Sequence, residues 1–230
     1  MRINGLLFDK DGTLFDFQHT WAAWAKAVIE DLSEGDLALR DRLAGAVGYN
    51  LNQGAFLVDS PLIACTNRQA AEYIARVVPH HDVDTIETRL SNSALDAPLA
   101  PVSDLPKLLT GFQTRGLKLG VMTNDSEAAA QAHLSNAGVV DYFNFIAGFD
   151  SGYGAKPDPD PLLAFAQAVG LEPRNVVMIG DSRHDLEAGR AAGMQTVGVL
   201  TGLATKSDLT SLADCVLPDI SHLPHWIDGS

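Results

Sequence analysis

Short runs of apolar residues recur along the chain, each four to seven residues long and rich in Val, Ile, Leu and Phe. A continuous apolar run of this length is typical of a strand that is buried on both faces of a parallel sheet. We therefore predict five strands, which lie within residues 3–8, 117–122, 143–149, 176–179 and 196–200.

Between the later runs the apolar positions follow the period of an α-helix, and three of the four patterns end just before a glycine. Strands that alternate with helices are typical of a parallel sheet with right-handed crossovers. The expected fold class is therefore α/β, with a Rossmann-like parallel sheet as its core. The predicted helices are 105–115, 127–136, 161–169 and 185–192.

One long segment interrupts this alternation directly after the first strand. A continuous apolar stripe at helical spacing runs from Trp21 to Leu32, and a second one runs from Ala70 to Val78. We predict that residues 17–97 form an inserted α-helical cap domain, and that residues 1–16 and 98–230 form the α/β core. Open α/β sheets bind ligands at their strand ends, so we expect the cap to cover a site there. The alternative is a helical decoration far from any site.

Composition narrows the range of partners. The chain carries 29 acidic against 16 basic side chains, a net charge of -13, which repels polyanions and argues against a nucleic acid partner. No stretch approaches the roughly 20 apolar residues of a membrane helix, so we expect no membrane partner. Cys65 and Cys215 have neither metal nor disulfide spacing. They indicate thiols in a reducing compartment and a cytoplasmic protein. The oligomeric state is not predicted.

The loop after the first strand concentrates negative charge. Asp9 and Asp11 are separated by one residue and are followed by Gly12 and Thr13. Two carboxylates at a strand end favour a bound cation, and hard oxygen ligands favour Mg²⁺ or Ca²⁺. The alternative is an ordinary Asp-rich turn.

Three later strand ends carry further polar groups. Thr123 and Asn124 precede a helix and could bind an anion or only cap that helix. Lys156 lies in a loop rich in Gly and Pro, where a lysine is normally solvated. Asp181 and Asp185 lie four residues apart at a strand-to-helix junction and could serve only as helix caps. Together these loops supply the parts of a phosphoryl-transfer site.

In order, character and spacing these loops resemble the four motifs of the haloacid dehalogenase superfamily, in its phosphatase branch. The motifs lie at 9–14, 123–124, 154–157 and 180–185. The resemblance covers the whole chain and is to phosphoglycolate-phosphatase-like members that carry a helical cap of the C1 type. It implies a core sheet with the strand order 5-4-1-2-3.

The resemblance also implies a role for each motif residue. Asp9 would be the nucleophile that attacks phosphorus and becomes an aspartyl phosphate. Asp11 would act as general acid and then general base. Mg²⁺ would be bound by Asp9, the backbone carbonyl of Asp11, and Asp181, with Asp185 as a further ligand directly or through water.

The phosphate itself would be bound by the second and third motifs. Thr123 and the amide of Asn124 would hold phosphate oxygens, and Lys156 would neutralise charge and position Asp9. The expected function is Mg²⁺-dependent hydrolysis of a small phosphorylated metabolite, a phosphoglycolate-like ester or a sugar phosphate. Two alternatives stay open: a phosphosugar mutase of the β-phosphoglucomutase type, and a non-catalytic metal-binding regulatory protein.

Some residues depart from the motifs or lie outside them. Lys10 stands where the family often has an apolar residue, and it could pair with a neighbouring carboxylate or reach solvent. Within the cap, Tyr49 and Asn50 lie in a glycine-bounded loop that could read the leaving group or form a plain surface turn. Arg68 could bind a second acidic group of the substrate or remain exposed. The histidines, His184 included, are assigned no role.

Overall fold

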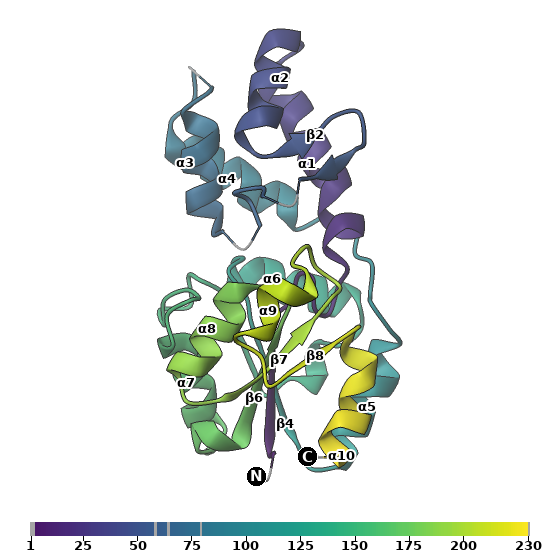
Figure 1. Cartoon of the computed structure of the whole chain (residues 1–230). Helices are drawn as coiled ribbons and strands as arrows, with labels where there is room; N and C mark the ends of the chain where they lie inside the picture. Colours follow the sequence, from purple (N-terminus) through teal and green to yellow (C-terminus); the bar gives the residue numbers. More distant parts are fainter. Residues whose placement is uncertain (1–2, 58, 64, 79, 230) are drawn as a thin grey trace.

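The computed structural model describes residues 3–57, 59–63, 65–78 and 80–229. It has two parts, a core built on a parallel sheet and a helical group that lies over one end of that sheet (Figure 1). We call this helical group, residues 17–97, the cap. The core strands are β1 (Gly5–Phe8), β4 (Lys118–Met122), β5 (Phe145–Ala147), β6 (Val176–Gly180), β7 (Gln195–Val199) and β8 (Cys215–Leu217).

The sheet has the order β5-β4-β1-β6-β7-β8, and every neighbouring pair is parallel. Its first five positions are the predicted order 5-4-1-2-3 seen from the other edge, so the α/β, Rossmann-like expectation is confirmed. The sixth strand, β8, was not predicted. It is a three-residue edge strand whose residues are all only half-buried, and so short a run gives no clear pattern.

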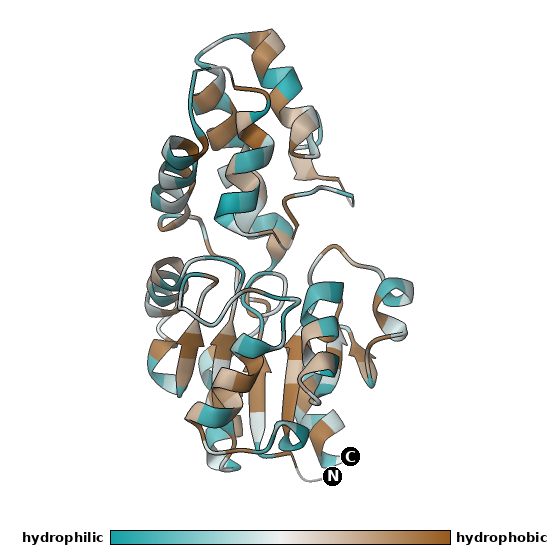
Figure 2. Cartoon of the chain, turned by 90° about the vertical axis from the view of Figure 1, so that its left-hand side faces the viewer, coloured by the Kyte–Doolittle hydropathy of each residue, from teal (hydrophilic) through white to brown (hydrophobic). Residues whose placement is uncertain are grey.

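Side chains alternate between the two faces of the sheet, and helices cover both faces. Leu6 and Phe8 of β1 join one hydrophobic cluster, whereas Leu7 joins the other. Hydropathy colouring shows the strands as the apolar centre of the core (Figure 2). The first face is covered by α5 (Leu105–Thr114), α6 (Glu127–Asn136) and α10 (Leu223–Asp228), and the second by α7 (Asp160–Ala168), α8 (Arg183–Ala191) and α9 (Lys206–Thr210). Short 3-10 helices lie at Val140–Tyr142, Pro173–Asn175 and Ile220–His222.

Local signals set the helix boundaries in the core. The Ser126 hydroxyl accepts the backbone N–H of Ala129 at the start of α6, and Ser182 with Asp185 forms a capping box at the start of α8. The glycines at 138, 170 and 193 follow α6, α7 and α8 with positive φ angles. Only glycine adopts that conformation without strain, which is why the sequence located these helix ends closely.

The cap has its own hydrophobic cluster, to which the stripe from Trp21 to Leu32 and residues Ala70 and Ile74 contribute. Its helices are α1 (Phe17–Ser33), α2 (Leu37–Ala46), α3 (Asn67–Ala75) and α4 (Val83–Ala94). The cap also contains one short hairpin that the sequence did not predict, in which β2 (Tyr49–Asn50) pairs with β3 (Ala55–Phe56) in antiparallel fashion. The two aromatic rings of this pair, Tyr49 and Phe56, pack edge to face with centroids 5.4 Å apart.

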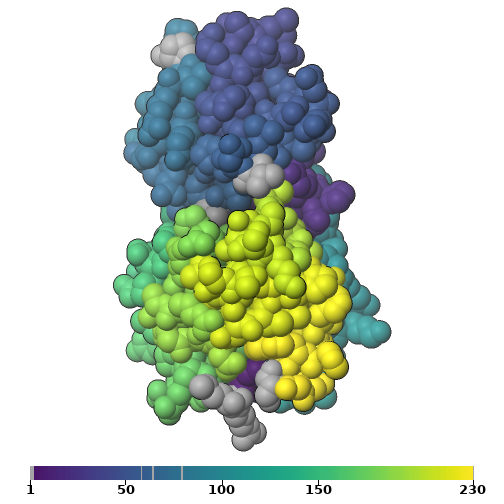
Figure 3. Space-filling view, in the orientation of Figure 1, coloured from purple at the N-terminus to yellow at the C-terminus, as the bar shows by residue number. Residues whose placement is uncertain are grey.

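The chain passes between core and cap through two adjacent segments. The backbone N–H of Asp16 donates to the carbonyl of Ala100, so the outgoing and returning segments are joined just below the cap. The core touches the cap again at Leu203, which packs against the cap cluster. The space-filling view shows the two parts in contact across a constriction (Figure 3). Over the described residues, no helix has both the length and the apolar character needed to cross a membrane.

Candidate active site

Four loops meet where the strand order reverses around β1. Asp9 follows β1, and its backbone N–H still donates to Ile179 of β6 at 2.8 Å. Thr123 follows β4, Asp181 follows β6, and Lys156 comes from the loop between β5 and α7. In an open parallel sheet this reversal leaves a crevice at the carboxyl ends of the strands. The topology therefore brings residues from across the sequence into one cavity, which all four line.

Lys156 is the central cation of this cavity. Its side chain is buried, and its ammonium group lies 2.6 Å from Asp9 Oδ1, 2.6 Å from Asp185 Oδ1 and 2.9 Å from the carbonyl oxygen of Met122. These three acceptors match the three protons of an ammonium group. Burial alone would lower the pKa of Lys156, but the carboxylates of Asp185 and Asp9 raise it above its ordinary value. Lys156 is therefore charged and held in place.

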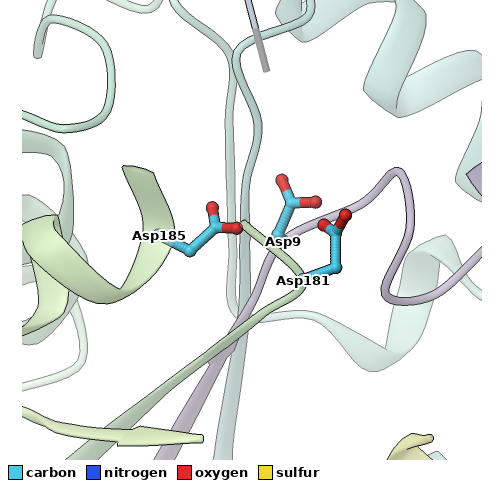
Figure 4. Close-up of side chains that lie close together, drawn as sticks. All are labelled: Asp9, Asp181 and Asp185. Carbon is cyan, nitrogen blue, oxygen red and sulfur yellow. The ribbon is translucent and has the colours of Figure 1, made fainter. Parts of the chain in front are cut away.

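Asp9, Asp181 and Asp185 form a cluster of carboxylates. They offer oxygen atoms that lie within 4.8 Å of one another, and Figure 4 shows them on three neighbouring segments around a common space. Burial raises the pKa of Asp9 to about 7, although Lys156 opposes the shift. Burial, with the charges of Asp9 and Asp185, raises the pKa of Asp181 well above its ordinary value. Such hard, crowded oxygen donors fit a divalent cation, which would relieve their repulsion.

Two glycines leave room for Asp181. Gly12 has a φ of +83°, and a Cβ atom on it would lie 2.5 Å from the Asp181 carboxyl group. A Cβ on Gly202 would lie 1.6 Å from Asp181 Oδ2. Thr201 donates its hydroxyl to the carbonyl of Gly12 at 2.6 Å. The loop after β7 thus supports the site, although neither Thr201 nor Gly202 belongs to a motif that the sequence revealed.

Two motif residues act on their neighbours as well as on the cavity. The side-chain amide of Asn124 donates to the carbonyl of Lys156 and accepts its backbone N–H, both at 2.9 Å. Asp185 uses one oxygen for Lys156 and the other for the N–H and hydroxyl of Ser182. Asp185 therefore caps α8, as the alternative reading of the sequence had it, and contacts Lys156 at the same time.

Lys10 is fully buried. Of the two possibilities that the sequence left open, it therefore pairs with neighbouring carboxylates and does not reach solvent. Its ammonium lies 2.7 Å from Asp11 Oδ2, 3.2 Å from Asp125 Oδ2 and 2.9 Å from His133 Nδ1. It also lies 5.3 Å from the ring centroid of Trp21. Burial opposes its charge, but Asp11 and Asp125 raise the pKa of Lys10 above its ordinary value. Lys10 therefore holds the Asp11 carboxyl group apart from the three-carboxylate cluster.

His133 connects this lysine to the cap. Its Nε2 lies 2.7 Å from the carbonyl of Ala94 at the end of α4, while Nδ1 faces the Lys10 ammonium. An ammonium group can only donate, so Nδ1 accepts and Nε2 carries the proton. Burial and the Lys10 charge lower the pKa of His133, which keeps the ring neutral. Nothing in its local sequence signals this role.

The three cap residues predicted to contact substrate lie elsewhere. The buried Tyr49 donates its hydroxyl to the carbonyl of Ala22 inside the cap. Asn50 accepts the backbone N–H groups of residues 52 and 53 and so stabilises its own turn. Arg68 is exposed and pairs with Asp84 and Glu87 of α4. None of the three is among the described residues that line the cavity.

The cap instead covers the site with apolar side chains that sequence reasoning did not assign to it. The described cap residues of the cavity lining are Phe17, Trp21, Trp24, Phe56, Leu62, Ile63, Cys65, Asn67 and Ala70. The apolar stripe of α1 was a usable signal, but a stripe at helical spacing looks the same whether it faces a core or a cavity.

Comparison of the chain with known protein families supports this geometry. The model of haloacid dehalogenase-like hydrolases matches residues 3–193. The chain belongs to this family. Among curated proteins, a phosphoglycolate phosphatase of Neisseria meningitidis is 32% identical over 234 residues, covering 99% of this chain and 90% of the relative. The prediction of a phosphatase of this superfamily is thereby confirmed.

Solved structures share the fold of this haloacid dehalogenase-like chain. A predicted phosphoglycolate phosphatase from Haemophilus somnus has a TM-score of 0.72 at 19% identity and covers 98% of both chains. A putative β-phosphoglucomutase from Thermotoga maritima has a TM-score of 0.68 at 18% identity, covering 99% of each. Phosphatase and mutase relatives thus have the same architecture, and the fold alone does not separate the two reactions.

The buried carboxylates predict how the stability of this hydrolase depends on pH. Asp9 titrates near pH 7 in the folded chain and Asp181 is shifted upward as well, so folded protein binds more protons than unfolded protein between about pH 4 and 7. In EDTA this contribution to stability is present at low pH and is lost as the pH rises through 7. We expect the stability of Asp9→Asn relative to wild type to rise by on the order of 2–3 kcal/mol between pH 5 and pH 8, because most of the window between the unfolded and folded pKa values of Asp9 lies in this range.

Urea unfolding at both pH values measures this difference. The exposed Asp41→Asn is the matched control and should show no pH-dependent gain. A constant difference between Asp9→Asn and wild type across this range would contradict the shifted titration of Asp9.

Proposed function

We propose that this chain is a Mg²⁺-dependent phosphatase that hydrolyses a small phosphomonoester through an aspartyl-phosphate intermediate. One observation carries the proposal: the Asp9 carboxylate is held by the Lys156 ammonium at 2.6 Å and lies beside Asp181 and Asp185 in a covered cavity. A fixed carboxylate with an adjacent cation and metal-type ligands is suited to nucleophilic attack on phosphorus.

The residues that would hold Mg²⁺ are Asp9, Asp181 and the backbone carbonyl of Asp11, with Asp185 behind them. Bound there, the metal would supply positive charge that offsets the dianionic phosphate. The chain has a net charge of -13, so long-range attraction does not bring the substrate in. The phosphate must therefore be attracted by positive charge within a few ångströms of Asp9. Lys156 alone does not suffice, because it is already shared between two carboxylates.

The chain's own residues carry the reaction in two steps. A carboxylate oxygen of Asp9 forms a bond to phosphorus while the bond from phosphorus to the ester oxygen breaks, and Asp11 gives its proton to the departing alkoxide. Asp11 then takes a proton from water, which attacks phosphorus and releases phosphate and the free Asp9. Asp11 Oδ1 is buried without a hydrogen-bond partner among the described residues, so it is the oxygen assigned to this exchange.

Thr123, Asn124 and Lys156 form the phosphate subsite in this proposal. All three line the cavity next to Asp9, and Asn124 fixes the backbone of Lys156 through two hydrogen bonds. Lys156 would neutralise charge on both the nucleophile and the phosphate. The substrate is a small phosphorylated metabolite, because the cap covers the cavity. The names of the relatives favour phosphoglycolate-like esters, and the two free thiols agree with a cytoplasmic location.

We expect the purified protein to release phosphate from p-nitrophenyl phosphate in Mg²⁺, with at least a 100-fold loss in EDTA that added Mg²⁺ reverses, because the carboxylate cluster needs a cation to admit a dianion. Phosphate release is read by colorimetry. Phosphosugars are assayed for isomerised as well as free phosphate, and isomerisation in place of hydrolysis would make the protein a mutase. No turnover of any ester, or activity insensitive to EDTA, would contradict the proposed reaction.

A further inference from the structure

The cap wall of the cavity is apolar and largely aromatic. Phe17 packs against Phe56 with ring centroids 5.4 Å apart, and Trp21 packs edge to face against Trp24 at 5.0 Å. The indole N–H of Trp24 is donated to the hydroxyl of Ser93 at 3.0 Å, so this polar atom is already used. Leu62 and Ile63 continue the wall. The cap wall, which would face the leaving group, is therefore apolar.

Charged groups are absent from this wall among the described cap residues that line the cavity, where Asn67 and Cys65 are the polar side chains. Burial raises the pKa of the Cys65 thiol to about 12, so it is neutral. Asn67 already donates to Ser91 at 3.2 Å.

Nearby cations are occupied elsewhere. Lys10 lies behind the Trp21 ring with no exposed surface and is paired with Asp11 and Asp125. Arg68 is exposed, pairs with Asp84 and Glu87 of α4, and is not among the described residues of the lining. Lys156 is bound by Asp9 and Asp185. His184, exposed on the core side, is the one remaining basic side chain in the described lining.

We propose, on the basis of the proposed phosphatase function, that the preferred substrate is a phosphomonoester of a neutral, apolar alcohol, aromatic in its best form, and not phosphoglycolate or a sugar phosphate. An aromatic leaving group would bury its ring against Phe17, Phe56 and the two tryptophans, where edge-to-face contacts are favourable. The specificity of the site thus differs from what the names of its relatives suggest.

The carboxylate of phosphoglycolate would bind unfavourably at the same wall. Against the cap wall it would lose its hydration shell without a charged partner among the described cap residues of the lining, since His184 lies on the core side, and the carboxylates of Asp11 and Asp125 in the lining would repel it. A sugar would leave its hydroxyl groups facing aromatic rings, where few hydrogen-bond partners replace the lost water.

The test compares kcat/KM for benzyl phosphate, phosphoglycolate and glucose 6-phosphate in Mg²⁺. All three release an alkoxide, so their intrinsic reactivity is similar and the comparison reports recognition. We expect benzyl phosphate to exceed each of the others by at least 10-fold. A smaller advantage, or a preference for phosphoglycolate or the sugar phosphate, overturns the inference but leaves the phosphatase function standing. If none of the esters is hydrolysed, the proposed function fails, and this inference fails with it.

A matched pair of variants ties the preference to the wall. Leu62 and Leu51 are both half-buried and both pack against the cap cluster, but only Leu62 lines the cavity. We expect Leu62→Ala to lower the ratio of kcat/KM for benzyl over methyl phosphate by about 10-fold, and Leu51→Ala to leave this ratio unchanged. General damage to the cap would change this kcat/KM ratio to the same extent in both variants. An equal change in both variants, or none in Leu62→Ala, overturns the assignment of the wall.

Discussion

Asp9→Asn is expected to lower kcat at least 10⁴-fold while the protein stays folded. An amide of the same shape keeps the packing at the end of β1 but cannot form the bond to phosphorus, and removing a nucleophile typically costs this much. Steady-state phosphate release measures the loss. Acid-quenched single turnovers with ³²P-labelled ester measure the intermediate directly, since wild type should retain label on protein and Asp9→Asn should retain none.

The control separates chemistry from folding. Asp9→Asn reduces the repulsion among three buried carboxylates, so its unfolding midpoint in EDTA should equal or exceed that of wild type at neutral pH. Hydroxylamine should release the label from wild type, as it does from an acyl phosphate. Label that persists in Asp9→Asn, or more than 1% of wild-type activity, would assign the nucleophile to another group.

Lys156→Met is expected to lower the free energy of unfolding by about 3–5 kcal/mol, because it leaves Asp9 and Asp185 buried without the cation that compensates them. Activity should fall at least 10³-fold, since the same group orients the nucleophile and balances charge in the transition state. Urea denaturation in EDTA measures the stability loss, and p-nitrophenyl phosphate turnover measures the activity.

Two comparisons make this result specific. The exposed Lys107→Met removes an identical side chain from the surface of α5 and should change neither quantity. Added Mg²⁺ should recover part of the stability of Lys156→Met by restoring positive charge near the carboxylates. A stability loss below about 1 kcal/mol would mean that Lys156 does not compensate these charges.

The core of the site was predictable because its signals are local. Each motif residue follows an apolar run that forms a strand, and parallel strands place their carboxyl ends at one edge of the sheet. Asp9, Thr123, Lys156 and Asp181 could therefore be expected to lie close together from their places in the chain, and they all line one cavity.

The cap residues were not predictable in the same way. Arg68 pairs with Asp84 and Glu87, which lie 16 and 19 positions further along, on another helix. A helical pattern indicates which residues share a face but not which neighbour that face meets. Tyr49 was expected near the substrate, yet its hydroxyl bonds to Ala22 within the cap. Arg68 and Tyr49 thus serve the internal structure of the cap, whereas the described cap residues that line the cavity are mostly apolar.

The sequence by itself located five core strands and placed each motif at a strand end, because these depend on short-range patterns in the chain. The strand order of the core followed from the resemblance of those motifs to the superfamily. Only the tertiary structure decided the environment of Lys10, whose partners Asp125 and His133 lie 115 and 123 residues away. It also decided that Phe17, Trp21 and Trp24 of α1 line the cavity, whereas the later positions of the α1 stripe pack inside the cap. Burial, charge pairing and the shape of a pocket arise from contacts between distant segments, and no local pattern records them.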